Sequence, residues 1–128
     1  MKNSSPATSE ERVQLVAGAA EEARALELVI LQVGKLLPFC EYFVICHGRS
    51  PLHCEAICDQ VEERLAQAGM RAHHREGEPR GEWTLLDYAD IVLHVFSESA
   101  RNFYGLERLW AEAPRVELRS PVPPAEGG

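Results

Sequence analysis

The stretch from residue 81 to residue 110, GEWTLLDYADIVLHVFSESARNFYGLERLW, constrains the fold more than any other part of the chain. Its runs 83–88 and 91–96 are rich in β-branched, aromatic and aliphatic residues, as strands are. Only Ala89 and Asp90 separate them, which predicts a β-hairpin. Strand side chains alternate between two faces, so one face carries Trp83, Leu85 and Asp87 and the other Thr84, Leu86 and Tyr88. Both faces are largely apolar, so either helices cover both of them or one face is kept for a partner.

The composition indicates one acidic globular domain. The chain has 128 residues, enough to bury a core of its own. Its net charge of −7, from 20 acidic and 13 basic residues, argues against nucleic acid as the main partner and favours a basic one. No apolar run is long enough to span a bilayer, and the first residues lack the apolar segment of a signal peptide. We therefore expect a cytoplasmic protein without a membrane partner.

The four cysteines lie at positions 40, 46, 54 and 58. Cys54 and Cys58, with His47 and His53 nearby, suggest zinc as one alternative. The CxxC pairs of structural zinc sites are absent, however, and free cysteine often serves as a small buried apolar residue. One apolar stripe with helical spacing contains Cys54, Ile57, Cys58, Val61, Leu65 and Ala68. We predict core cysteines, no bound metal and no cofactor.

Capping signals predict where the helices begin. Thr8 and Glu11 match a capping box, which opens a helix that runs to about residue 24. Ser50 suits the N-cap of a second helix over residues 51–68, and Gly69 follows as its stop. Ser97 can cap a third helix that reaches residue 110, with a weak point at position 105 because glycine disfavours helix interiors.

The order of the elements predicts an α/β fold. Helices and strands alternate with one βαβ-like step, which gives a mixed sheet of about five strands flanked by helices. The predicted strands are residues 26–33, 42–46, 72–74, 83–88 and 91–96, with a charged loop at 75–81. We expect little order in residues 1–8, one domain over 9–115, and little order in the Pro- and Gly-containing tail 116–128.

Five segments carry a family resemblance, and they are EYFVI (41–45), GRS (48–50), AICD (56–59), WTLLDYADIVLHVF (83–96) and FYGLERLW (103–110). With them the chain resembles the ribosomal silencing factor family, also called the Iojap-related family, over about residues 10–115. The last two motifs together are specific. Glu27 and Gln32 replace the acidic residues usual in the corresponding strand of the family, Glu41 replaces an aspartate, and Gly105 replaces a better helix former. These departures lie outside the hairpin motif and affect local detail only.

The resemblance implies a nucleotidyltransferase-like fold without catalytic residues. It also implies binding to the large ribosomal subunit at its fourteenth protein, on the face that meets the small subunit. The bound factor blocks subunit joining and represses translation under nutrient limitation or in stationary phase. The family occurs in bacteria, mitochondria and chloroplasts, and the N-terminus of this chain favours a bacterium. An apolar face of this kind can also form homodimers when no ribosome is present.

Matching the family motif assigns partner binding to Trp83, Leu85, Asp87, Tyr88 and Asp90. Trp and Tyr are common interface anchors, and a carboxylate at a strand end can pair with a basic partner. The alternative is that the apolar residues are ordinary core and that the aspartates stabilise the turn.

Four further residues carry less specific signals. His94 lies in an apolar strand, which favours a hydrogen-bonded core histidine over a partner contact. Tyr104 borders either the interface or the core. Glu76 and Glu78 flank a loop glycine and can reach a basic partner, although a solvated loop is the simpler interpretation.

The rival hypothesis is an enzyme or nucleotide-binding protein with the nucleotidyltransferase fold. The residues 48–50 at a helix N-terminus can hold phosphate through backbone amides. Phosphoryl transfer also needs paired carboxylates for Mg²⁺. Asp87 and Asp90 are three residues apart across a turn, and Glu76 and Glu78 lie in a predicted loop, so neither pair fits. The residues therefore favour a protein that binds without catalysis.

Overall fold

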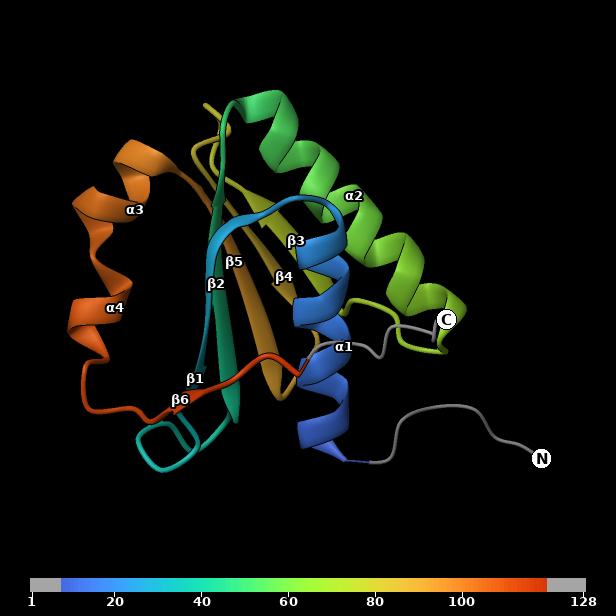
Figure 1. Cartoon of the computed structure of the whole chain (residues 1–128), viewed down its shortest axis with the longest axis vertical. Helices are drawn as coiled ribbons and strands as arrows, with labels where there is room; N and C mark the ends of the chain where they lie inside the picture. Colours follow the sequence, from blue (N-terminus) through green and yellow to red (C-terminus); the bar gives the residue numbers. More distant parts are fainter. Residues whose placement is uncertain (1–7, 120–128) are drawn as a thin grey trace, which may run out of the picture.

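The computed structural model describes residues 8–119, in which six strands form one mixed sheet in the order β3-β4-β5-β2-β1-β6. Only the central pair β2 and β5 is parallel, and every other neighbouring pair is antiparallel. Helices α1 and α2 cover one face of the sheet, and α3 and α4 lie on the other (Figure 1). The elements are α1 (Ser9–Glu22), β1 (Leu26–Gln32), β2 (Tyr42–Gly48), α2 (Pro51–Gln67), β3 (His74–Gly77), β4 (Trp83–Asp87), β5 (Ile91–Ser97), α3 (Glu98–Tyr104), α4 (Leu106–Leu109) and β6 (Arg115–Val116). The predicted α/β class is confirmed.

The predicted caps are present. The Thr8 hydroxyl accepts from the backbone N–H of Glu11, and the Glu11 carboxylate accepts from the backbone N–H of Thr8, so the capping box is complete. Ser50 accepts from the backbone N–H of His53 at the start of α2, and Ser97 accepts from that of Ala100 at the start of α3. Short-range sequence signals therefore determine where each of these helices begins.

The sheet buries an apolar cluster on each face. On the α1/α2 face, Val13, Val16, Ile57 and Val61 pack onto strand residues such as Leu93. On the α3/α4 face, the cluster contains Leu31, Phe43, Ile45, Phe96 and Ala100. Because helices lie on both faces, the central strands β2 and β5 are mostly apolar and mostly buried, as parallel strands inside a sheet are.

All four cysteines are buried free thiols, as predicted for core residues. Cys46, Cys54 and Cys58 belong to the α1/α2 cluster, and Cys40 belongs to the other. Burial raises the pKa of the Cys58 thiol to about 12 and that of Cys40 to about 11, so both remain protonated at neutral pH. Within residues 8–119 no cluster of three or more His, Cys, Asp or Glu side chains is arranged to hold a metal ion.

Two predicted elements differ in the structure. The short strand expected at 72–74 is β3 at His74–Gly77, because its register is set by pairing with β4 rather than by its own composition. The helix expected to reach residue 110 is interrupted by Gly105, which has φ of 58° in the left-handed region and ends α3. One predicted helix is therefore two short ones.

A sixth strand accounts for the difference from the expected five. β6 pairs with β1, with Val116 opposite Ile30, so ordered structure extends beyond the predicted boundary at residue 115. The remaining parts of the predicted terminal segments, residues 1–7 and 120–128, lie outside the described residues. No helix in the described part of the chain is long and apolar enough to cross a membrane.

Candidate partner-binding site

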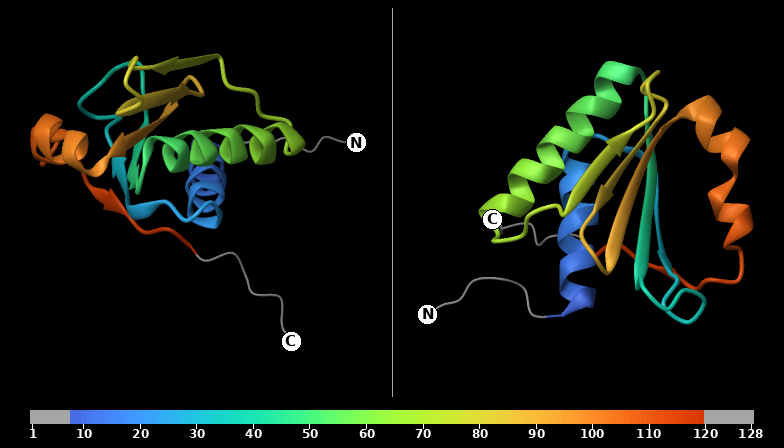
Figure 2. Two further views of the ribbon diagram at one scale, coloured as in Figure 1. Left: turned by 90° about the horizontal axis from the view of Figure 1, so that it is seen from above. Right: turned by 180° about the vertical axis from the view of Figure 1, so that it is seen from behind.

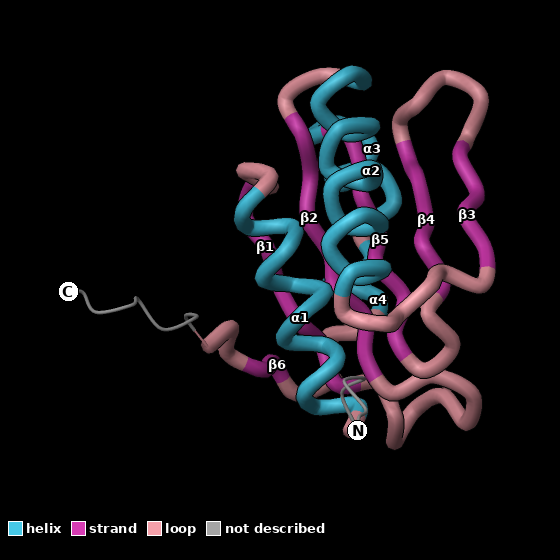
Figure 3. Tube along the Cα trace, turned by 90° about the vertical axis from the view of Figure 1, so that its right-hand side faces the viewer, coloured by secondary structure: helices cyan, strands magenta, loops and turns pink. Residues whose placement is uncertain are grey.

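The face of β4 that carries Trp83, Leu85 and Asp87 is the face on which α3 and α4 lie. β3 and β4 form the end of the sheet farthest from β1 and β6, and they extend beyond α2 when viewed from the side of the two long helices (Figures 2 and 3). All three side chains are half-buried, so they are neither sealed in the core nor fully solvated. We call Trp83, Leu85 and Asp87 the β4 face.

Trp83 is at the centre of an aromatic group. Its ring lies 4.7 Å from that of Tyr104 and 4.9 Å from that of Phe96, measured between centroids. Tyr104 is exposed, and Phe103 next to it is 79% exposed. Phe103 and Tyr104, at the end of α3, therefore extend the apolar surface of Trp83 toward solvent.

Leu85 and Trp83 line an open pocket of about 320 Å³ together with Glu76, Gly77 and Glu78. Glu76 pairs directly with Leu85 across the β3–β4 ladder, and its carboxylate is well exposed. Glu78 is held by Arg80 at 3.1 Å and accepts from the backbone N–H groups of Glu82 and Arg80, which lower its pKa. The pocket thus has an apolar floor with carboxylates beside it, which suits an amphipathic basic side chain.

Asp87 lies at the end of β4 and stabilises the turn. Its Oδ1 accepts from the backbone N–H of Ala89 at 2.7 Å, and Ala89 has φ of 74° in the left-handed region. This contact is the turn-stabilising role that aspartate often has at such a position. The carboxylate remains half-exposed on the β4 face, so capping the turn leaves it available to a charged partner.

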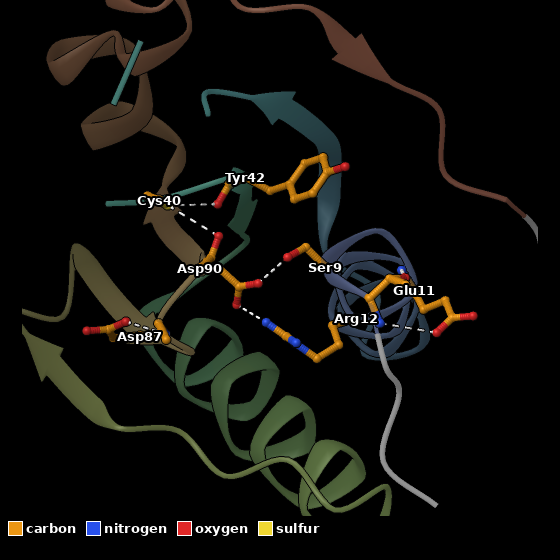
Figure 4. A network of polar contacts seen from close by, with 9 residues as sticks. Ser9, Glu11, Arg12, Cys40, Tyr42, Asp87 and Asp90 are labelled. Atoms are coloured by element: carbon orange, nitrogen blue, oxygen red, sulfur yellow. Dashed lines mark hydrogen bonds and ion pairs between the residues drawn. The ribbon is translucent and has the colours of Figure 1, made fainter. Parts of the chain in front are cut away.

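Tyr88 and Asp90 lie elsewhere. Tyr88 is buried in the cluster under α1 and α2, and its hydroxyl has no hydrogen-bond partner among the described residues. The Asp90 carboxylate binds the Ser9 hydroxyl and the Arg12 guanidinium of α1 (Figure 4). The burial of Tyr88 and the side-chain contacts of Asp90 support a structural role for both residues.

The backbone of Asp90 reinforces that role. Its carbonyl accepts from the backbone N–H of Glu41 at 2.8 Å and from that of Tyr42 at 3.1 Å. The Cys40 thiol also lies within hydrogen-bonding distance of this carbonyl (Figure 4). Ser9 and Arg12 lower the pKa of the carboxyl against the opposing effect of burial. Asp90 thus joins three segments that are distant in the sequence.

His94 is a buried, hydrogen-bonded histidine, as predicted. It is 5% exposed, and its Nδ1 accepts from the indole N–H of Trp83 at 3.3 Å. Burial lowers the pKa of His94 to about 4, so the imidazole is neutral at physiological pH.

This shift predicts a loss of stability in mild acid. The unfolded chain binds a proton on His94 below about pH 6.5 and the folded chain does so only near pH 4, so stability is complete above pH 6.5 and falls as the pH drops toward 4. The contribution at pH 5 is on the order of 2 kcal/mol. Urea unfolding at pH 7.5 and pH 5.0 measures how much the free energy of unfolding differs between the two pH values. In His94→Phe this difference is expected to shrink by the His94 contribution. An unchanged difference in that variant would contradict the assignment.

The groups proposed for nucleotide chemistry are engaged in local contacts. The Ser50 hydroxyl caps α2, and the backbone N–H of Arg49 donates to Nδ1 of His53 at 2.9 Å. Asp90 binds Arg12, and Asp87 binds its own turn. The arrangement favours the interpretation of this chain as a binding domain.

Comparison with known proteins decides the family. The family model described as "Ribosomal silencing factor during starvation" matches residues 6–127. The chain belongs to the ribosomal silencing factor family. Family membership implies a ribosomal partner and a role in the regulation of translation.

Three relatives support this assignment. The chain is 32% identical to the ribosomal silencing factor RsfS of Halalkalibacterium halodurans, over 90% of this chain and 98% of that protein. It is 32% identical to RsfS of Bacillus subtilis, over 83% and 90%. It is also 30% identical to the chloroplastic protein Iojap of Zea mays, over 80% of this chain and 45% of that protein.

Two crystal structures share the fold. A protein from Chromobacterium violaceum matches with a TM-score of 0.79 and 28% identity, over 82% of this chain and 88% of that one. A protein from Bacillus halodurans matches with a TM-score of 0.75 and 33% identity, over 86% and 100%. The mixed sheet and its helices are thus those of the ribosomal silencing factors.

The structure adds Phe103 to the candidate surface and places Glu76, which the sequence left as either a solvated loop residue or a partner contact, beside Leu85. The sequence did not assign Phe103 to partner binding, because it lies in the apolar pattern of a predicted long helix. The signal that could have corrected this was Gly105, since ending the helix there leaves its final residues less covered.

Proposed function

We propose that this chain binds the large ribosomal subunit through its fourteenth protein and prevents joining of the small subunit. It represses translation in this way under nutrient limitation or in stationary phase, in the cytoplasm of a bacterium. The chain acts by occupying a surface, and no step requires catalysis. The binding partner and the blocked step follow from the family resemblance, and the β4 face supplies the physical basis.

The composition of the β4 face is the observation that carries this proposal. Trp83 and Leu85 offer apolar area beside the carboxylates of Asp87 and Glu76. Partly exposed aromatic residues are frequent hot spots of interfaces, and carboxylates around them select a basic partner and steer its approach. Ribosomal proteins bind RNA and are basic as a class, so charge favours the encounter with an acidic chain.

Blocking by occupancy needs only a bound domain. A folded domain of 14.3 kDa on the face that meets the small subunit excludes the other subunit by volume alone.

The β4 face can also pair two free copies of the chain, and such a homodimer must dissociate before ribosome binding. Light scattering of the free protein measures this competing state.

Sedimentation through sucrose gradients tests the proposal. We expect the protein to sediment with purified bacterial large subunits, but not with small subunits or with assembled ribosomes. Asp87→Arg is expected to weaken this binding, because it places a positive charge against a basic partner. Glu63→Arg, on the exposed side of α2 across the sheet, is the matched charge control. Equal binding to large subunits and to assembled ribosomes would contradict the mechanism.

A further inference from the structure

The imidazole of His94 lies beneath the β4 face in one defined protonation state. Indole nitrogen is only a donor, so the bond from Trp83 Nε1 to His94 Nδ1 requires Nδ1 to be the unprotonated acceptor. The single proton of the neutral ring is then on Nε2. That atom is buried and has no hydrogen-bond partner among the described residues.

Aromatic neighbours hold the ring from other sides. Phe43 meets it edge-on at 4.7 Å, and Phe96 lies nearly parallel to it at 6.2 Å, measured between centroids. A leucine or a phenylalanine in these surroundings would bring no unpaired polar atom of its own. A buried donor without a partner, such as Nε2 of His94, lowers stability. The histidine at this position therefore points to a role for its other nitrogen, the acceptor Nδ1.

We propose that His94 is a positioning residue of the β4 face that holds the indole of Trp83 in its docking orientation. This inference rests on the proposed function. The hydrogen bond turns the N–H edge of the indole inward and leaves its carbon atoms to line the pocket with Leu85. A partner therefore meets an apolar anchor that has no donor of its own to satisfy.

The ring contacts of Trp83 alone do not achieve this orientation. The contacts of Trp83 with Phe96 and Tyr104 limit the tilt of the indole plane. They do not select which edge of the ring points inward, because a flip of the indole by about 180° about its Cβ–Cγ bond keeps the ring in a similar plane and exchanges its two edges. A hydrogen bond from one ring atom to a buried acceptor selects that edge.

NMR of the free protein tests the positioning without any ribosome. In ¹⁵N-labelled protein we expect the Nδ1 shift of an unprotonated nitrogen for His94 and slow hydrogen exchange of the Trp83 indole proton. His94→Phe keeps an apolar ring but removes the acceptor, so the indole signal is expected to shift and its exchange to accelerate. His94→Asn keeps an acceptor near the Nδ1 position and is expected to restore part of the protection. The indole of Trp110 is the internal reference.

A double-mutant cycle tests the docking role. We expect His94→Phe to weaken binding to large subunits by about five- to tenfold, as loss of one hydrogen bond does. In a Trp83→Phe background, which lacks the indole donor, the same change is expected to have little effect. Urea unfolding of each variant at pH 7.5 shows whether the variants remain folded under the binding conditions.

The NMR experiment and the double-mutant cycle test the positioning role and the docking role separately. A protonated Nδ1, or an indole signal unchanged in His94→Phe, would overturn the positioning role. Equal losses from His94→Phe in both backgrounds would overturn the docking role. If the wild-type protein does not bind large subunits, the proposed function and the docking role both fail, while NMR still decides whether His94 holds the indole.

Discussion

We expect Trp83→Ala to weaken binding to large ribosomal subunits by about 2–4 kcal/mol, a factor of roughly 30 to 1,000. The indole is half-buried, contacts the rings of Phe96 and Tyr104, and lines the pocket with Leu85. Alanine removes the anchor and also leaves Tyr104 without the ring that it contacts. Titration of labelled protein against purified subunits, followed by sedimentation, measures the change.

Leu52→Ala is the matched control for this variant. Leu52 is a 75% exposed apolar residue on α2, on the opposite side of the sheet, so its loss removes a similar kind of surface from a different place. We expect unchanged binding for this control. Circular dichroism and urea unfolding must show that Trp83→Ala remains folded, because an unfolded variant would indicate that the indole mainly serves the core.

Short-range patterns explain the parts of the fold that could be predicted. The β4–β5 hairpin, the alternation that separates Trp83 from Leu86, and the caps at Thr8 and Ser50 all involve residues within a few positions of each other. Propensity, alternation and capping operate over that range. The buried cysteines belong to the same class, because the helical stripe of α2 places Cys54 and Cys58 on one face.

The remaining features depend on contacts between distant residues. Asp90 looked like a turn residue or a partner contact, but its carboxylate binds Ser9, which lies 81 positions earlier. Tyr88 has the composition of an interface anchor and lies in the core, because the face it points to is the one that α2 covers. Strand β3 is placed by its pairing with β4, and its own four residues are all exposed. A single sequence does not encode such pairings in any local pattern.

The helices that flank the β4 face are held by a buried arginine. Arg101 of α3 is 7% exposed, and its Nε and Nη2 donate to the Glu107 carboxylate at 2.9 and 3.1 Å. Its Nη1 donates to the Leu26 carbonyl at 3.2 Å and to His47 Nδ1 at 3.0 Å. These contacts join α3, α4, β1 and β2. Arg101 also lowers the pKa of Glu107, and burial followed by the Arg101 charge lowers that of His47.

We expect Arg101→Ala to reduce the free energy of unfolding by about 3 kcal/mol, as measured by urea denaturation at pH 7.5. Removing Arg101 leaves the partly buried Glu107 carboxylate with only the more distant Arg115 guanidinium, at 4.0 Å, and a backbone carbonyl and an imidazole also lose their donor. Arg101→Lys is the matched variant. It keeps the charge but lacks the planar fork that reaches Glu107 and His47 together, so only part of the loss is expected to be recovered.

Arg80→Ala separates this effect from ordinary surface charge. Arg80 also pairs with a glutamate, but its side chain is exposed, so we expect little change in stability. Equal behaviour of the two alanine variants would show that the Arg101 contacts do not stabilise the fold. Because α3 carries Tyr104 onto Trp83, Arg101→Ala should also weaken subunit binding. That loss should exceed what the unfolded fraction alone explains, since the contact between Tyr104 and the indole depends on where α3 is held.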